Sequence, residues 1–323
     1  MAKKRTEHPA KSPTGQERCL RFLYGCVPGR VLLRLLRARW VSHTVGAYMN
    51  SPLSAGRAKR TARAWKVDPS QFEGDIFRSY NAFFTRKRKQ PIFPADGTEA
   101  NADALLSPAD SRLTIVPLRK GTAFPVKQAP YTVAQLLGNT PETNRLARRY
   151  ENGYAFVFRL SVEDYHRYAY PDDGKELKHW FLRGTLHTVN PIALEKLPVF
   201  HRNCREVTLL DCKHFGRLAF VEVGAMLVGK IVNRHPKTFS RGEEKGYFEF
   251  GGSTIVLLAE PGKVLPERKL LLNSLAGKET YVRQGQAVGR AVPPAFPSAV
   301  PSHVTHEKEK YDNNLQKGTD SHD

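Results

Sequence analysis

The chain has 323 residues, of which 40% are hydrophobic and 25% are charged, a composition that excludes fibrous and fully disordered proteins. With 51 Lys and Arg against 31 Asp and Glu, its formal net charge is +20, so it is attracted to polyanions, either nucleic acid or an anionic membrane surface. The four cysteines are too few and too widely spaced for a disulfide scaffold. Free thiols in a reducing compartment are favoured, with a Cys204–Cys212 bridge left open.

The N-terminal part of the chain is the most basic, because its first 60 residues carry 13 Lys or Arg and only 2 Glu. Residues 1–17 are polar and predict a disordered tail. Residues 18–40 mix leucines with arginines, and a helix restarting after Pro28-Gly29 would place Leu32, Leu35 and Leu36 on one face. Such a helix either lies in a membrane interface or packs on the protein's own core with its arginines in water. We expect neither a secretory signal nor a transmembrane helix.

Residues 54–90 also look helical and basic, so we expect a helical membrane-interface region over 18–95. They contain the aromatic residues Tyr80, Phe83 and Phe84 just before the cationic run 86–89. These aromatics either stack on nucleobases or anchor a core with a basic rim. We favour the core, because no nucleic-acid-binding motif accompanies them, and we do not expect nucleic acid as a partner.

From about residue 96 the pattern changes to short β-like runs separated by Gly, Pro, Asp and Asn. The runs cover 112–118, 154–160, 180–189, 205–210, 217–223 and 226–232, with a short helix expected at 129–137. This pattern predicts an α+β protein whose catalytic domain, over 96–290, is a mainly antiparallel β-sandwich or barrel-like system. Residues 291–323 are proline-rich and then polar, and predict a second disordered tail.

The run Gly251-Gly252-Ser253-Thr254 precedes a buried strand predicted at 255–258. Because glycine has no Cβ, the backbone before Ser253 is free to bend, and the Ser253 hydroxyl could then attack the carbonyl before it. The alternative is a bulged strand entry with a serine that caps a turn.

Asp110 and His166 are the other candidates for chemistry. An Asp, a His and a Ser from distant parts of a chain can assemble a base-activated hydroxyl, in which the carboxylate orients the imidazole. Each residue also has a structural interpretation: Asp110 follows Ser-Pro-Ala and could close an Asx-turn, and His166 lies between tyrosines and could be a core histidine.

Several motifs in consistent order over residues 18–290 resemble the phosphatidylserine decarboxylase family. They are Phe83-Phe84-Thr85-Arg86, Ser107-Pro108-Ala109-Asp110, Asp164-Tyr165-His166-Arg167, Leu186-His187-Thr188-Val189-Asn190-Pro191, Val221-Glu222-Val223-Gly224-Ala225, Val228-Gly229, Lys245-Gly246-Tyr247-Phe248 and Gly251-Gly252-Ser253-Thr254.

The resemblance implies a self-cleaving proenzyme that is cut between Gly252 and Ser253. Ser253 would become a covalent pyruvoyl group, which serves as the electron sink for decarboxylation of phosphatidylserine to phosphatidylethanolamine and CO2 through a Schiff base. Asp110 would belong to the self-cleavage triad and His166 to the decarboxylation step. The chains 1–252 and 253–323 would stay associated, and a homodimer is one option for their assembly. No metal is implied.

One position departs from the family pattern. Many members carry a second histidine three residues after the first and use it as the cleavage base, but this chain has Ala169 there. Either His166 or His187 could supply the base instead. We hypothesise that His187 does, against the alternative that it is a strand histidine bonded to backbone.

Phosphatidylserine is an anionic lipid, so the basic N-terminal region predicts peripheral binding to an anionic phospholipid membrane, on the cytoplasmic face of a bacterial-type inner membrane. Two alternatives remain. One is a pyruvoyl-dependent decarboxylase of a free aromatic amino acid, and the other is an uncleaved homologue that only binds phospholipid.

Overall fold

The computed structural model describes residues 15–36, 39–74, 77–90, 103–119, 124–126, 129–184, 203–224, 230–249 and 253–293. The chain divides into one compact unit over Met1–Ala291 and a second over Val292–Asp323, and all the described helices and strands belong to the first. Most of the tails predicted at 1–17 and 291–323 lies outside the described residues. The first helix begins at Gly15 and the last strand ends at Ala291.

The α-helices are α1 (Gly15–Gly25), α2 (Val27–Leu36), α3 (Arg39–Asn50), α4 (Ala55–Ala64), α5 (Tyr80–Phe84), α6 (Val133–Leu137), α7 (Pro141–Ala147) and α10 (Arg268–Leu275). The strands are β1 (Ala104–Leu106), β2 (Ser111–Pro117), β3 (Phe124–Val126), β4 (Ala129–Tyr131), β5 (Tyr154–Leu160), β6 (Arg167–Ala169), β7 (Gly174–Leu182), β8 (Arg205–Cys212), β9 (Gly216–Val223), β10 (Ile231–Asn233), β11 (Thr238–Phe239), β12 (Glu244–Phe248), β13 (Ser253–Ala259), β14 (Val264–Pro266), β15 (Thr280–Val282) and β16 (Ala287–Ala291).

Eight strands form the main sheet, in the order β11-β7-β8-β9-β13-β5-β2-β15, and every pair in it is antiparallel. Smaller sheets have the orders β1-β16-β14, β10-β12-β6 and β3-β4. Among the described strands the main sheet is open, with β11 and β15 at its edges. The predicted α+β class with a mainly antiparallel, sandwich-like arrangement is therefore confirmed, and the main sheet does not close into a barrel.

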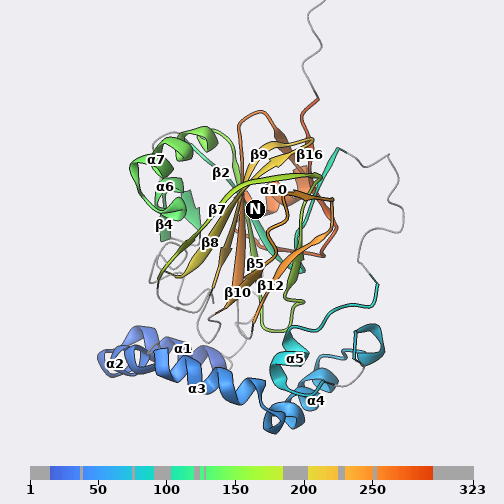
Figure 1. The fold of residues 1–323 in the computed structure, drawn as a ribbon. Helices are drawn as coiled ribbons and strands as arrows, with labels where there is room; N and C mark the ends of the chain where they lie inside the picture. The colour runs from blue at the N-terminus through green and yellow to red at the C-terminus, as the bar shows by residue number, and fades with distance from the viewer. Residues whose placement is uncertain are drawn as a thin grey trace, which may run out of the picture. The chain divides into compact units, whose positions relative to one another are not determined.

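The main sheet buries both of its faces, which explains the unbroken apolar run in β13. Ile255 and Leu257 join one core with Phe156, Phe158 and the α10 residue Leu270. Val256 and Leu258 join the other core, to which α6 contributes Leu136 and Leu137. Successive side chains of a strand point to opposite faces, so a strand buried on both sides needs apolar residues at every position. Figure 1 shows α6 and α7 beside the sheet.

Helix α6 begins and ends at recognisable signals. The Thr132 side chain accepts a hydrogen bond from the Gln135 backbone N–H, and the Gln135 side chain accepts one from the Thr132 N–H, which is a capping box. Gly138 ends the helix at φ 126°, a conformation that favours glycine. The helix predicted over 129–137 is therefore wrong in its first part, since residues 129–131 form strand β4.

The aromatic residues of the basic segment lie in the core. Tyr80 and Phe83 are buried with Phe72, Phe77 and Tyr165 in a cluster that α4 completes with two alanines. The Ser79 side chain caps α5 by accepting from the Ala82 N–H. Since Phe83 has no exposed surface, it is not available to stack on a nucleobase.

Helices α1 and α2 meet closely, and the expected break at Pro28-Gly29 is wrong. The bend falls at Cys26, and Pro28 sits in the first turn of α2, where proline's missing N–H costs no hydrogen bond. At Gly29 a Cβ would come within 2.0 Å of the Phe22 carbonyl oxygen, so only glycine permits this approach.

All four cysteines are free. Within the described ranges, no helix has both the length and the apolarity to cross a membrane.

Candidate active site

Ser253 is the first residue of β13, in the interior of the main sheet. It pairs with Leu160 of β5, and its side chain is fully buried. By the alternation along β13 it faces the same side as Ile255 and Leu257. The serine predicted as nucleophile therefore lies in a water-excluded place at the start of a rigid strand.

His166 is the residue that contacts the Ser253 hydroxyl. It follows a tight turn in which the Asp164 carboxylate accepts from the Ser161 N–H at 2.6 Å. Its Nδ1 lies 3.3 Å from Ser253 Oγ, and its Nε2 lies 2.9 Å from the Ser161 carbonyl oxygen. Phe84 stacks on the imidazole with 3.9 Å between ring centroids, and Phe248 meets it edge-on. Packing and hydrogen bonds thus hold the ring in one orientation.

The hydrogen bonds also define the tautomer of His166. A carbonyl oxygen only accepts, so Nε2 must carry the proton that it donates to Ser161. In a neutral imidazole Nδ1 then has a free lone pair, and it can accept the proton of Ser253 Oγ. This is the arrangement of a general base next to a hydroxyl nucleophile.

The surroundings keep this imidazole neutral. Burial lowers the pKa of His166 to about 3, the hydrogen bond to Ser161 opposes the shift, and the positive charge of Arg86 adds to it. Arg86 is itself buried and lies over the Phe83 ring at 4.8 Å. Near neutral pH the lone pair at Nδ1 is therefore present in essentially every molecule.

The hydrogen bonds of Asp110 join it to residues other than His166 and Ser253, with which its predicted role in the triad would place it. One carboxylate oxygen accepts from the Arg88 guanidinium at 3.1 Å, and the other accepts from the Gln284 N–H at 2.8 Å. Among the described residues, no hydrogen bond joins Asp110 to His166 or Ser253. Asp110 is nevertheless close enough to Asp164 to help raise the pKa of that carboxyl to about 6, after burial as the main cause.

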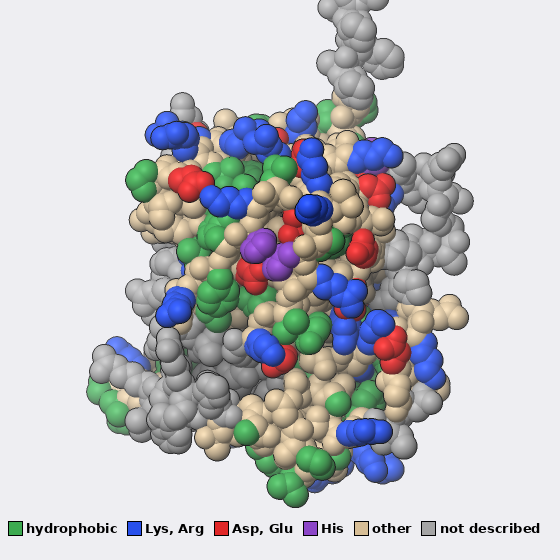
Figure 2. All heavy atoms as spheres, viewed as in Figure 1, with side chains coloured by type: hydrophobic (Ala, Val, Ile, Leu, Met, Phe, Trp, Pro, Cys, Tyr) green, Lys and Arg blue, Asp and Glu red, His purple; other side chains and the backbone are tan. Residues whose placement is uncertain are grey.

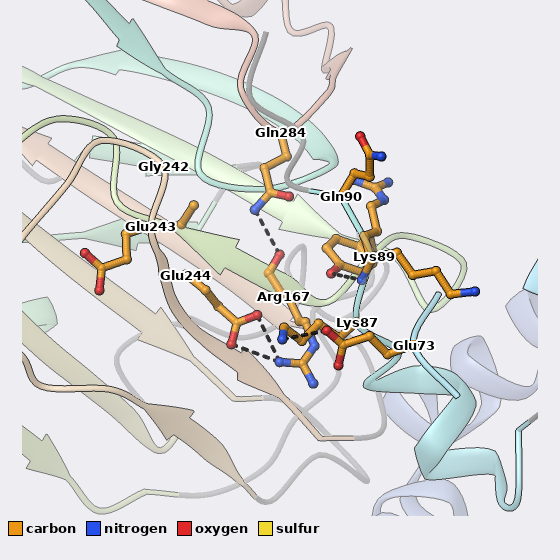
Figure 3. A pocket seen from close by; sticks show the side chains of 12 residues that line it. Glu73, Lys87, Lys89, Gln90, Arg167, Gly242, Glu243, Glu244 and Gln284 are labelled. Carbon is orange, nitrogen blue, oxygen red and sulfur yellow. Dashed lines mark hydrogen bonds and ion pairs between the residues drawn. The ribbon is translucent and has the colours of Figure 1, made fainter. Parts of the chain in front are cut away.

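Ala169, the position at which many family members have histidine, belongs to the wall of a pocket. The pocket has a volume of about 330 Å³ and is lined by Glu73, Lys87, Arg88, Lys89, Gln90, Tyr165, Arg167, Ala169, Gly242, Glu243, Glu244 and Gln284 (Figure 3). Arg167 also lines the pocket and donates two hydrogen bonds to Glu244. Tyr168, which lies between Arg167 and Ala169 in β6, faces the core. Ala169 therefore points away from the face of β6 that carries Tyr168. His187 and Gly252 lie outside the described residues.

A buried ion pair near the middle of the main sheet was missed as a site feature. Glu222 of β9 and Lys245 of β12 have no exposed side-chain surface, and the Lys245 Nζ donates to Glu222 Oε1 at 2.5 Å. Glu222 is the neighbour of Ile255 across the β9–β13 pair. Burial raises the pKa of Glu222 to about 7, while the ammonium of Lys245 opposes this rise. In the sequence, the signal for this ion pair was Glu222, a charged residue between two valines of an apolar strand.

Fold and site together define an α+β protein with a buried serine, positioned against a neutral histidine at the start of an interior strand. The family model for phosphatidylserine decarboxylase matches residues 80–290. The chain is 38% identical to phosphatidylserine decarboxylase proenzyme 2 of Clostridium acetobutylicum, over 84% of this chain and 91% of the relative. It is 36% identical to the proenzyme of Clostridium tetani and 34% identical to that of Ruminiclostridium cellulolyticum, each over 85% of this chain and 92% of the relative. The chain belongs to the phosphatidylserine decarboxylase family and is an enzyme of the decarboxylase class.

Proposed function

We propose that this protein converts phosphatidylserine to phosphatidylethanolamine and CO2, after cutting itself between Gly252 and Ser253. The observation that carries the proposal is the contact between Ser253 Oγ and His166 Nδ1 inside a family motif. The matched relatives are named proenzymes, which supports a processing step. Asp110, Arg88 and Gln284 would act on the shape of the site rather than on the hydroxyl.

In the proposed cleavage, His166 Nδ1 accepts the proton of Ser253 Oγ, and Oγ attacks the carbonyl carbon of Gly252. The hydrogen bond from Nε2 to the Ser161 carbonyl stays in place and becomes stronger once the ring is charged. The peptide bond would be replaced by an ester to Oγ, and loss of the Ser253 α-proton and of the Gly252 carboxylate would leave a dehydroalanine at the head of the small chain. Water would then hydrolyse its imine tautomer to the pyruvoyl group and release the nitrogen as ammonia. Only a residue with a β-hydroxyl permits this elimination.

The residues present fit a pyruvoyl group at position 253. Ser253 supplies its carbon skeleton, and it lies in a fully buried position next to one imidazole. The group would supply an electron sink for the loss of CO2. The role of His166 beside it would be to take up a proton at Nδ1 during the reaction and pass it to the reacting centre, which suits a ring held rigidly by Phe84.

The intact mass of the purified protein tests cleavage directly. We expect two chains, 1–252 and 253–323, the second beginning with pyruvoyl, and a single full-length mass for Ser253→Ala. Release of CO2 from phosphatidylserine in mixed micelles tests the reaction, with the same variant as control. A single full-length mass for the wild type, or no release of CO2 from the cleaved protein, would contradict the proposal.

We also propose peripheral binding to an anionic membrane, on the cytoplasmic face of a bacterial-type inner membrane. The surface of α1 and α2 supports the contact with an anionic membrane. Phe22, Val27, Val31 and Leu32 are exposed there, between the exposed arginines Arg18, Arg21 and Arg30. Apolar side chains between cations are the pattern of an interfacial helix, and each Lys or Arg adds about 1 kcal/mol near an anionic surface.

Deletion of residues 1–40 tests this membrane role. It should reduce binding to phosphatidylserine vesicles more than turnover of a short-chain, soluble substrate. Equal losses of binding and turnover would speak against a membrane role for these helices.

A further inference from the structure

Two histidines and two glutamates gather at one place that is separate from Ser253 and His166. Glu176 and His179 belong to β7, Glu206 belongs to β8, and His235 lies between β10 and β11. A histidine patch with acidic side chains against it is visible on the face shown in Figure 2. His179 is the most exposed of them, at 48% of its side chain, the His235 side chain is 29% exposed, and the Glu176 side chain is 6% exposed.

A β-bulge brings Glu176 and His179 to the same face of β7. Glu176 is opposite Leu210 and Lys178 is opposite the next residue, Leu209, so Leu177 is an extra residue in the strand. Residues three apart in a regular strand point to opposite faces, and one extra residue cancels this alternation. Bulges often re-aim side chains in this way beside functional sites. Because of the bulge, the Glu-x-x-His spacing gave no sign of a metal site in the sequence.

The three candidate ligand atoms lie at spacings suited to a metal ion. Glu176 Oε2 is 3.1 Å from His235 Nδ1 and 3.9 Å from His179 Nδ1, and all three atoms are within 4.8 Å of one another. Tetrahedral zinc sites with bonds of about 2.0–2.2 Å hold their ligand atoms about 3.4 Å apart. The two imidazoles stack with 3.7 Å between centroids, and a rotation of the exposed His179 ring would turn its lone pair toward the ion.

The remaining polar atoms of Glu176 and His235 already have partners. Tyr170 Oη donates to Glu176 Oε1 at 2.7 Å, which leaves Oε2 for another contact. Glu206 Oε1 lies 3.0 Å from His235 Nε2, which leaves Nδ1 with its lone pair when the ring is neutral. A metal-bound histidine usually donates its other N–H to a carboxylate in this manner, and such outer contacts fix both tautomer and ring orientation.

We propose that Glu176, His179 and His235 bind a divalent transition metal ion, with zinc as the expected ion and water in the fourth position. Two imidazoles and one carboxylate are a common ligand set for zinc. The ion would replace the proton shared between Glu176 Oε2 and His235 Nδ1. It would tie β7 to the segment that follows β10, whose partner β12 pairs with β6 beside His166.

Titration of the metal-stripped full-length protein with ZnCl2 in competition with a chromophoric chelator tests this site, and Co2+ absorption reports its coordination geometry. We expect one ion per chain, a tetrahedral Co2+ spectrum, and a higher melting temperature with Zn2+. His179→Ala and Glu176→Gln should abolish stoichiometric binding, and Glu206→Gln should weaken it by about 10- to 100-fold. His214→Ala is the matched control, because His214 pairs with Asp172 outside the cluster.

Two results would overturn the proposal. One is the absence of stoichiometric Zn2+ or Co2+ binding by the wild type, in which case His235 simply bridges the carboxylates of Glu176 and Glu206. The other is binding that persists in His179→Ala, which would place the ion elsewhere. Because His179 is the most exposed of the three ligands, its variant is expected to fold and decides the question even if a His235 variant does not fold.

Discussion

Replacing His166 with asparagine removes the proposed base and keeps a hydrogen-bond acceptor close to where Nδ1 stands. The contact to be tested joins Nδ1 to Ser253 Oγ over 3.3 Å, a distance that still permits proton transfer and is often longer before reaction. Asparagine can accept the hydroxyl hydrogen bond, but it cannot take up the proton. The variant therefore separates positioning of the serine from activation of it.

The size of the effect follows from the environment of the ring. A positioned general base contributes about 10²- to 10⁴-fold, and its contribution is greatest when its pKa is near the working pH. Burial lowers the pKa of His166 to about 3, so the ring is always free to accept a proton but is a weak base. We therefore expect an effect at the lower end of that range. The cleavage rate of His166→Asn should fall by about 100-fold, which corresponds to an activation barrier raised by about 3 kcal/mol.

The assay follows the appearance of chain 253–323 by intact mass after a short pulse of cell-free synthesis. Ser253→Ala marks zero cleavage, and His214→Asn is a matched histidine control, because His214 bonds to Asp172. The reasoning is refuted if His166→Asn cleaves at the wild-type rate. If His187→Ala alone abolishes cleavage while His166→Asn does not, the base is His187, as the sequence had led us to hypothesise.

Three further predictions follow from the same structure. Ala169→His should leave the cleavage rate unchanged in the pulse assay and should not rescue His166→Asn, because position 169 lines the pocket beside Arg167. Faster cleavage by Ala169→His would contradict the orientation of β6. In the uncut Ser253→Ala background, Lys245→Met should lower the free energy of unfolding in urea by about 3–5 kcal/mol, because it leaves Glu222 buried without its partner, and adding Glu222→Gln should recover part of the loss. In the unfolded chain the His166 imidazole becomes protonated below its ordinary pKa of 6.5, whereas in the folded chain its pKa is lowered to about 3 and the ring stays neutral down to that pH. The stability that His166 contributes therefore falls as the pH falls through this window. The difference in unfolding free energy between the parent and His166→Asn should shrink by about 2 kcal/mol from pH 6.5 to pH 4.5, and a difference independent of pH would show that the ring is not buried as described.

Sequence patterns located the strands that are buried on both faces. The predicted runs 154–160 and 217–223 match β5 and β9 closely, since these strands need apolar residues at nearly every position. Strand β7 was predicted to begin at residue 180, whereas it begins at Gly174. Its first half carries charged side chains next to the edge strand β11, so no apolar pattern marks it.

The candidate site was only partly readable from the sequence. Ser253 and His166 were found by motif, and the structure brings them together across 87 positions of the chain. The partners of Asp110 could not be found in this way, because Arg88 and Gln284 approach it from segments 22 and 174 residues away. Long-range pairings of this kind leave no local pattern, and the same holds for Glu222 with Lys245.

The place of Ser253 at the head of β13 has a consequence for what a cut would produce. Strand β13 is hydrogen-bonded to β5 on one side and to β9 on the other, along nearly its whole length. Beyond it, β16 pairs with β1, and β15 pairs with β2. A chain that starts at residue 253 thus contributes strands that pair with strands of the other chain in two sheets, rather than packing on its surface. Breaking one peptide bond would change the chemistry of a single terminus, while separating the two chains would require unfolding the sheet.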